Sequence, residues 1–119
     1  NKDQYIAALK NIEVSGEFTL KVMISDLMYK SLSGYNYVFF ILKEDNSKVP
    51  FAVRKFNRVD LPPNLILNSN NKMIKNTYIP KKVRLYIKGS DTPGVTDSMK
   101  EVHRSDMLDL SKLDKYVIN

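Results

Sequence analysis

The chain has 119 residues, no Cys, and a net charge of +6 from 19 basic and 13 acidic side chains. One domain of this length can bury a sufficient core without disulfides or bound metals. The lack of Cys excludes disulfides, thiolate metal sites and Cys nucleophiles. No apolar run is long enough to cross a bilayer. Because the sequence begins at Asn1, without Met or a signal-like apolar segment, we expect a cut or mature form of a longer protein. Composition leaves the compartment open, with an intracellular one slightly favoured.

The first third of the chain predicts a short helix and then a strand. Ile6 and Leu9 follow Asp3, a candidate N-cap, and this favours a helix over about residues 3–10. In Glu17–Asp26 every second residue is apolar, which is the pattern of a half-buried strand.

The next two expected strands form a hairpin. Tyr35–Lys43 is apolar on both faces, so this strand should be central in its sheet. Lys48–Asn57 follows after a short polar connection, which implies antiparallel pairing of the two. In this third strand we expect Phe51 and Val53 on the inner face, and Arg54 and Phe56 on the outer face.

The second half contains a linker and two further strands. Pro62-Pro63 excludes a regular helix or a central strand there, and residues 65–67 are expected to anchor the linker on the core. A fourth strand is expected over Lys82–Gly89. Lys100–Leu110 is ambiguous between a weak fifth strand and the start of a helix over about 105–117, which Ser105 could cap.

This order of elements resembles the OB-fold superfamily, whose members are five-stranded barrels. The resemblance is one of pattern and covers residues 16–110, which would form the barrel core of a single domain spanning 1–119. We therefore expect a mainly β protein: a five-stranded OB-like barrel, or a strongly curved antiparallel sheet, with short terminal helices. A β-sandwich would give similar alternation.

Positive charge is concentrated between Lys48 and Lys88, where ten basic side chains accompany a single acid, Asp60. A local cationic surface indicates a polyanionic partner. OB-folds, as the resemblance implies, often bind single-stranded nucleic acid on strands two and three and in adjoining loops. The candidate nucleic-acid-binding residues are Lys21, Tyr37, Phe39, Arg54, Phe56, Arg58, Lys72, Lys75, Arg84, Tyr86 and Lys88.

Three readings of these residues are open. The first is a non-enzymatic nucleic-acid-binding domain, most simply for single-stranded DNA or RNA, in which cations neutralise phosphate and aromatic rings stack on bases. The second is a protein-interaction module of a larger complex, whose aromatic face a partner protein or a terminal helix covers. The third is adhesion to an anionic membrane or polysaccharide, which leaves the outward rings unexplained.

Nothing in the sequence predicts an enzyme, a metal site or a cofactor. His103 is the only histidine and lies in a polar stretch, which is typical of a surface residue. The four Gly residues are scattered, so no phosphate-cradling loop is expected. No spacing of Ser, Asp and Lys indicates a nucleophile with its base.

Overall fold

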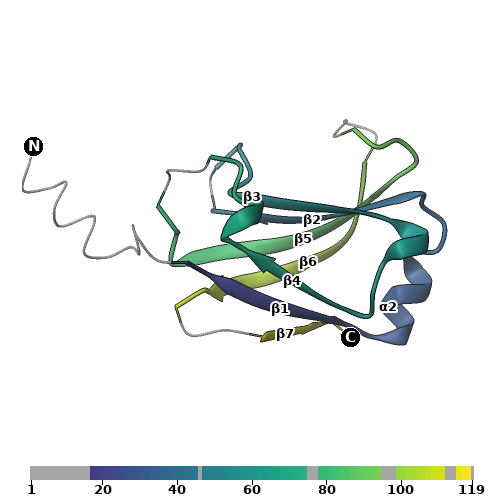
Figure 1. The fold of residues 1–119 in the computed structure, drawn as a ribbon, viewed down its shortest axis with the longest axis horizontal. Coiled ribbons are helices and arrows are strands. Elements are labelled where there is room, and N and C mark those ends of the chain that lie inside the picture. Colours follow the sequence, from purple (N-terminus) through teal and green to yellow (C-terminus); the bar gives the residue numbers. More distant parts are fainter. Residues whose placement is uncertain (1–16, 46, 75–77, 95–98, 112–114, 119) are drawn as a thin grey trace, which may run out of the picture.

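A computed structural model describes residues 17–45, 47–74, 78–94, 99–111 and 115–118 (Figure 1). The expected helix over residues 3–10 lies outside these ranges. The elements are β1 (Thr19–Ile24), α2 (Asp26–Ser31), β2 (Tyr37–Lys43), β3 (Ala52–Asn57), β4 (Asn64–Asn68), β5 (Lys82–Ser90), β6 (Lys100–Asp109) and β7 (Lys115–Ile118), with 3-10 turns at Arg58–Asp60 and Ser69–Asn71.

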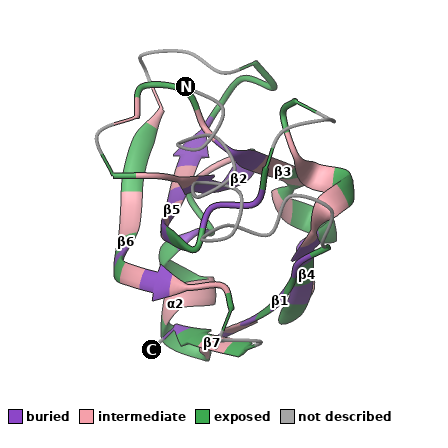
Figure 2. Cartoon of the chain, turned by 90° about the vertical axis from the view of Figure 1, so that its left-hand side faces the viewer, coloured by how far each residue is buried: buried purple, intermediate pink, exposed green. Residues whose placement is uncertain are grey.

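The strands form two sheets, with the orders β4-β1-β7 and β3-β2-β5-β6. β1 and β7 run parallel, and all the other pairs are antiparallel. Seen end-on, the strands of both sheets surround a buried interior (Figure 2). The mainly β class is confirmed. Among the described residues, however, the chain has seven strands in two sheets and no closed barrel.

Alternation along the strands builds the core between the sheets. Leu20, Val22 and Ile24 of β1 are buried, as the sequence predicts, and so are Val83, Leu85 and Ile87 of β5. The other sheet positions in this cluster include Val38, Phe40, Leu42, Leu65, Leu67, Leu108 and Ile118. Burying an aliphatic side chain of this size stabilises the fold by about 1.5–3 kcal/mol.

β2 is central, as expected, because it lies between β3 and β5. Residues 38–42 are all buried, which explains why this strand is apolar on both faces. The predicted hairpin of β2 and β3 is also confirmed by their antiparallel register.

The linker after β3 contains a strand that the sequence did not predict. β4 starts directly after Pro62-Pro63 and lies at an edge of its sheet, which is the position that prolines tolerate. Leu65 and Leu67 do anchor this segment on the core, whereas Ile66 points outward and is 42% exposed.

The expected helix over 105–117 is wrong. β6 continues to Asp109 and β7 begins at Lys115, so both ends of that range are extended. The Ser105 hydroxyl does not cap a helix; it accepts a hydrogen bond from the Leu85 amide at 2.8 Å, beside a register shift between β5 and β6. Pairing with β5 and burial of Ile118 outweigh a weak helical pattern.

The first strand is shorter than expected because a helix follows it at once. Ser25 caps α2, its hydroxyl accepting a hydrogen bond from the Met28 amide at 3.1 Å. The fourth expected strand is one residue longer, with Gly89 inside β5. A Cβ at Gly89 would lie 2.4 Å from the ring of Tyr35, so only glycine fits beneath that ring.

Candidate functional site

The outer face of the four-stranded sheet gathers basic and aromatic side chains. Residues paired across neighbouring strands share a face. The register places Phe39 between Lys55 and Lys88, and it places Ile41 between Val53 and Tyr86. Lys43 lies opposite Arg84, and Arg104 lies opposite Tyr86. We call this surface the basic–aromatic face and define it by Tyr37, Phe39, Ile41, Lys43, Lys55, Arg84, Tyr86, Lys88 and Arg104. The same register also places Val53, Glu101 and Met107 on it.

The half-exposed ring of Tyr86 is surrounded by positive charge. Its centroid lies 5.3 Å from the Arg104 guanidinium carbon, 5.5 Å from Lys43 Nζ and 5.9 Å from Lys88 Nζ. Tyr37 is likewise 5.8 Å from Lys55 Nζ. Such cation–π contacts at exposed sites contribute about 0.5–1 kcal/mol each. The cations are therefore held near the rings, and Lys55 Nζ also donates a hydrogen bond to the Pro93 carbonyl at 3.3 Å.

One acid lies among these cations. Glu101 is opposite Lys88 in the register and accepts a hydrogen bond from Arg104 Nη2 at 2.9 Å. This hydrogen bond and the negative charge of Glu101 raise the pKa of Arg104 above its usual range. Arg84 is also tethered, because its Nη1 donates to the Ser105 carbonyl at 2.9 Å. Lys43, Lys55 and Lys88 carry the remaining positive charge of the face.

Two apolar members of the face are covered. Phe39 is 2% exposed and Ile41 5%, although neither belongs to the core cluster between the sheets. The residues that flank Phe39, Lys55 and Lys88, have long aliphatic stems that can cover a ring while their charges stay hydrated. Tyr37 and Tyr86 therefore offer the accessible rings, and Phe39 does not.

Five of the predicted site residues come together on this face: Tyr37, Phe39, Arg84, Tyr86 and Lys88. The others lie elsewhere. Lys21 is on the outer face of the other sheet, paired with Ile66 and Lys115. Arg58 begins the 3-10 turn after β3, and Lys72 follows the second 3-10 turn. Lys75 lies outside the described residues.

The predicted outward positions of β3 are wrong. Arg54 pairs with Phe40 and Phe56 pairs with Val38, so both residues share the core-facing side of the sheet. The Phe56 ring packs edge-on against Phe40 at 5.8 Å. The prediction placed Phe51 and Val53 on the same inner face of one strand. Phe51 instead precedes β3 and packs on Phe18, so its burial does not indicate which face of β3 is inward.

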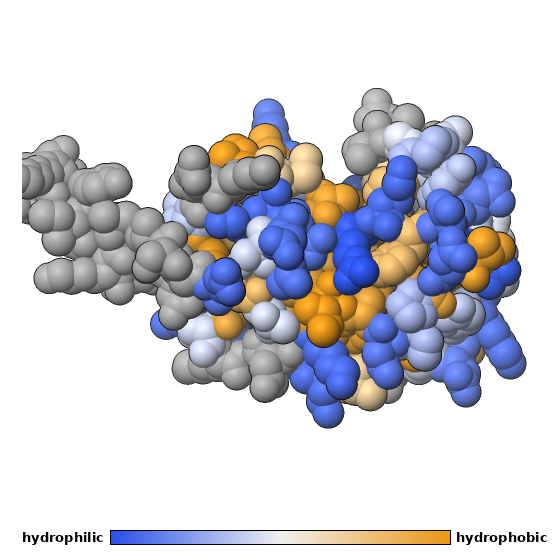
Figure 3. All heavy atoms as spheres, in the orientation of Figure 1, coloured by the Kyte–Doolittle hydropathy of each residue, from blue (hydrophilic) through white to orange (hydrophobic). Residues whose placement is uncertain are grey.

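Arg54 closes the seam between the two sheets. Its guanidinium carbon lies 4.6 Å from the Phe56 ring centroid, and its Nη1 donates to the Ile66 carbonyl of β4 at 2.6 Å. In Figure 3 hydrophobic residues reach the surface in the middle of the view, among hydrophilic ones. The half-buried Phe56 and the exposed Ile66 lie beside this seam. Arg54 thus joins β3 to β4.

Besides Ile41, three cationic members of the face were not among the predicted residues: Lys43, Lys55 and Arg104. Lys43 continues the alternation of Tyr37, Phe39 and Ile41, and this signal was available in the sequence. Lys55 was missed because the faces of β3 were reversed. Arg104 was missed because its segment was ambiguous between strand and helix.

Comparison with protein-family models, with curated proteins and with solved structures gives no match. In the part of the chain that the structure describes, no helix is long and apolar enough to cross a membrane. Within the same ranges no three side chains of His, Cys, Asp or Glu gather as a metal site. The basic–aromatic face is therefore the candidate functional site.

Proposed function

We propose that this chain is a non-enzymatic nucleic-acid-binding domain that holds single-stranded DNA or RNA on the basic–aromatic face. One observation carries the proposal: five cations and two half-exposed tyrosine rings share one face of a sheet. Cations neutralise the phosphates of a single strand, and aromatic rings accept its unstacked bases.

The geometry limits how much of a strand the face can hold. Each base stacked on an aromatic ring contributes about 1–3 kcal/mol, and Tyr37 and Tyr86 offer two such rings. A base that stacks on Tyr86 displaces Lys43, Lys88 or Arg104 from that ring. The two lysines can then reach the flanking phosphates, while Arg104 stays paired with Glu101. We therefore expect a short contact of a few nucleotides.

Fluorescence anisotropy with labelled single-stranded DNA and RNA, at low and moderate salt, tests the proposal. Affinity should fall with salt by about 0.7 in log K per decade of salt for each phosphate neutralised. Lys88→Ala should weaken binding and reduce this slope by about one phosphate. Lys21→Ala is the matched control, because Lys21 is an exposed strand lysine on the other sheet. No binding at low salt, or equal loss in both variants, contradicts the proposal.

A protein-interaction module is the second candidate. It is favoured by exposed apolar side chains outside the basic–aromatic face: Val49 is 59% exposed, Met73 55% and Ile74 61%. Large exposed apolar groups that lie close together often mark an interface. Sedimentation and a pull-down from native extract test this candidate. A monomer that retrieves no protein and binds oligonucleotide argues against it.

Kinship with the OB-fold superfamily also stays a proposal. The hairpin of β2 and β3 supports it, while β1 pairs with β4 and β7 rather than with β2. The proposed binding function does not depend on that kinship.

A further inference from the structure

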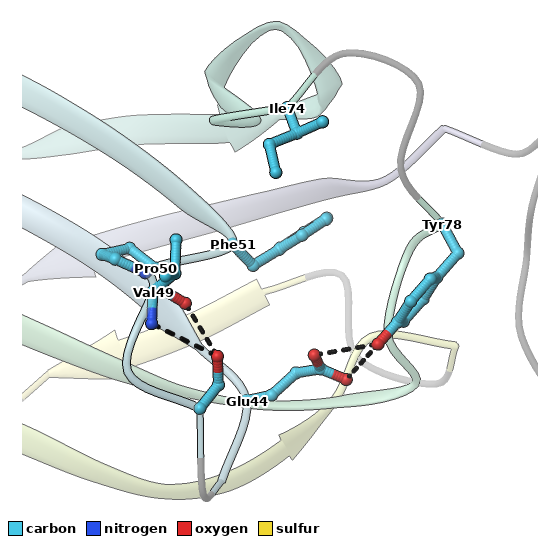
Figure 4. A pocket seen from close by; sticks show the side chains of 7 residues that line it. Glu44, Val49, Pro50, Phe51, Ile74 and Tyr78 are labelled. Atoms are coloured by element: carbon cyan, nitrogen blue, oxygen red, sulfur yellow. Dashed lines mark hydrogen bonds between the residues drawn. The ribbon is translucent and has the colours of Figure 1, made fainter.

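A small pocket with a single acid lies beside the exposed apolar residues. It has a volume of about 130 Å³, and Glu44, Val49, Phe51, Ile74 and Tyr78 are among its lining residues. Figure 4 shows these side chains around one space, with the Tyr78 hydroxyl directed at the Glu44 carboxylate. A cavity of roughly 150 Å³ holds benzene, so this one suits a group of about five or six heavy atoms.

Glu44 is the one charged residue among the described residues that line the pocket. The Tyr78 hydroxyl lies 3.1 and 3.0 Å from its two oxygens. A carboxylate accepts about four hydrogen bonds and a hydroxyl donates one, so acceptor capacity remains. No described cation forms an ion pair with Glu44, and the neighbouring Lys48 does not line the pocket.

The walls and the rim are apolar. Phe51 forms a buried wall, and Val49 and Ile74 expose more than half of their surface at the mouth. The Tyr78 hydroxyl is protonated at neutral pH, and burial, followed by the Glu44 hydrogen bond, raises its pKa further. Because that hydroxyl is already within hydrogen-bond distance of both carboxylate oxygens, a compact point charge fits better than the two-pronged guanidinium of Arg.

We propose that this pocket binds the side chain of a lysine in a partner protein, with the ammonium group on Glu44 and apolar flanking residues on Val49 and Ile74. The butyl stem of the lysine lies against Phe51, and its charge complements the single acid. This inference is independent of the basic–aromatic face, which attracts anions. Failure of one proposal leaves the other standing.

The experiment uses the full chain and three probes: acetyl-Leu-Lys-Leu-amide, the same peptide with an Nε-acetylated lysine, and n-butylammonium. Binding is followed by NMR shifts of the Glu44, Val49, Ile74 and Tyr78 amides and by calorimetry at physiological salt. The lysine peptide should shift these amides and bind at least tenfold more tightly than its acetylated form. It should also bind more tightly than n-butylammonium, which makes no contact with the rim.

Glu44→Gln and Asp45→Asn form a matched pair of variants. Each removes one negative charge from the same loop, but Asp45 does not line the pocket. Gln keeps an oxygen for the Tyr78 hydroxyl, so the fold should persist, as its NMR spectrum will show. Glu44→Gln should weaken the lysine peptide at least tenfold, and Asp45→Asn should change its affinity less than twofold. Equal binding of the acetylated peptide, unchanged affinity of Glu44→Gln, or n-butylammonium binding as tightly as the peptide each overturns the proposal.

Discussion

Tyr86 is the residue on which the proposed function depends most. Its ring is half-exposed and has cations from β2, β5 and β6 around it. This arrangement leaves one aromatic surface at the centre of the positive charge. A base stacked there has phosphate-binding groups on several sides, which a ring at the edge of the sheet would not provide.

Two replacements of Tyr86 should distinguish the contribution of its ring to binding from that of its hydroxyl. Tyr86→Ala removes the stacking surface, and we expect the dissociation constant for a single-stranded oligonucleotide to rise roughly tenfold or more. Tyr86→Phe keeps the ring and should bind within about threefold of the unaltered chain. Anisotropy titrations at one salt concentration measure both variants. Equal losses in the two variants would mean that the hydroxyl, and not stacking, matters.

Phe56 should behave in the opposite way. Because its ring packs on Phe40 on the core side of β3, Phe56→Ala should lower the free energy of unfolding by about 1–3 kcal/mol while oligonucleotide affinity stays unchanged. Urea unfolding and anisotropy on the same variant check both halves. If Phe56→Ala kept full stability and bound the oligonucleotide more weakly, Phe56 would be a binding residue and not a core residue.

At the scale of elements, the apolar pattern predicted the strands β1, β2, β3 and β5, but not β4 and β7. β1 and β5 have strong apolar periodicity, and their inward residues follow from it. β2 is apolar on both faces, and this predicted its central position in the sheet. For β3 the predicted faces were wrong. Phe51, which packs on Phe18 before the strand starts, counts as an inward residue of the strand in the apolar pattern, and this reversed the faces assigned to Arg54 and Phe56. The predicted outward faces were accordingly correct on β2 and β5 and wrong on β3.

β4 and β7 could not be predicted, because their stability comes from distant partners. β4 has five residues and β7 four, too few for a periodic pattern to stand out. Each exists by pairing with β1, far away in the chain. Local propensity does not contain that information.

β7 offers a clean test of its inward and outward positions. Ile118 is fully buried, so Ile118→Ala should destabilise the fold by about 2–5 kcal/mol. Its neighbour Val117 points outward and is 47% exposed, so Val117→Ala should change stability by less than about 0.5 kcal/mol. Denaturant melts compare the two. Similar costs at both positions would mean that β7 does not pack as a strand on the core.

At the scale of the whole molecule, the two sheets are linked at both sides. Arg54 reaches from β3 to β4 on one side. On the other side, Nε2 of His103 in β6 lies 3.1 Å from the hydroxyl oxygen of Tyr116 in β7. Burial lowers the pKa of His103, outweighing the nearby Glu101, which raises it. Burial also raises the pKa of Tyr116.

The lowered pKa of His103 makes stability depend on pH. The unfolded chain takes up a proton near pH 6.5 and the folded chain only at lower pH, so acid favours unfolding. The contribution of His103 is complete above about pH 6.5 and is lost as the pH falls through the folded pKa. Since this is the only histidine, His103→Gln should flatten the fall in unfolding free energy between about pH 7 and pH 5. Urea melts at several pH values measure the difference, and identical slopes would contradict it.

The pairing of β1 has a consequence for how the chain folds during synthesis. β1 is made before the other described strands, yet its neighbours β4 and β7 come much later, and β7 after all the rest. A nascent chain that has emerged through β6 already contains every strand of the four-stranded sheet, while the side of β1 that β7 will cover is still open. An open strand edge invites pairing with other chains. The few residues of Lys115–Ile118 therefore close the second side of β1 last, and the short strand β7 replaces the longer β1 as the edge of its sheet.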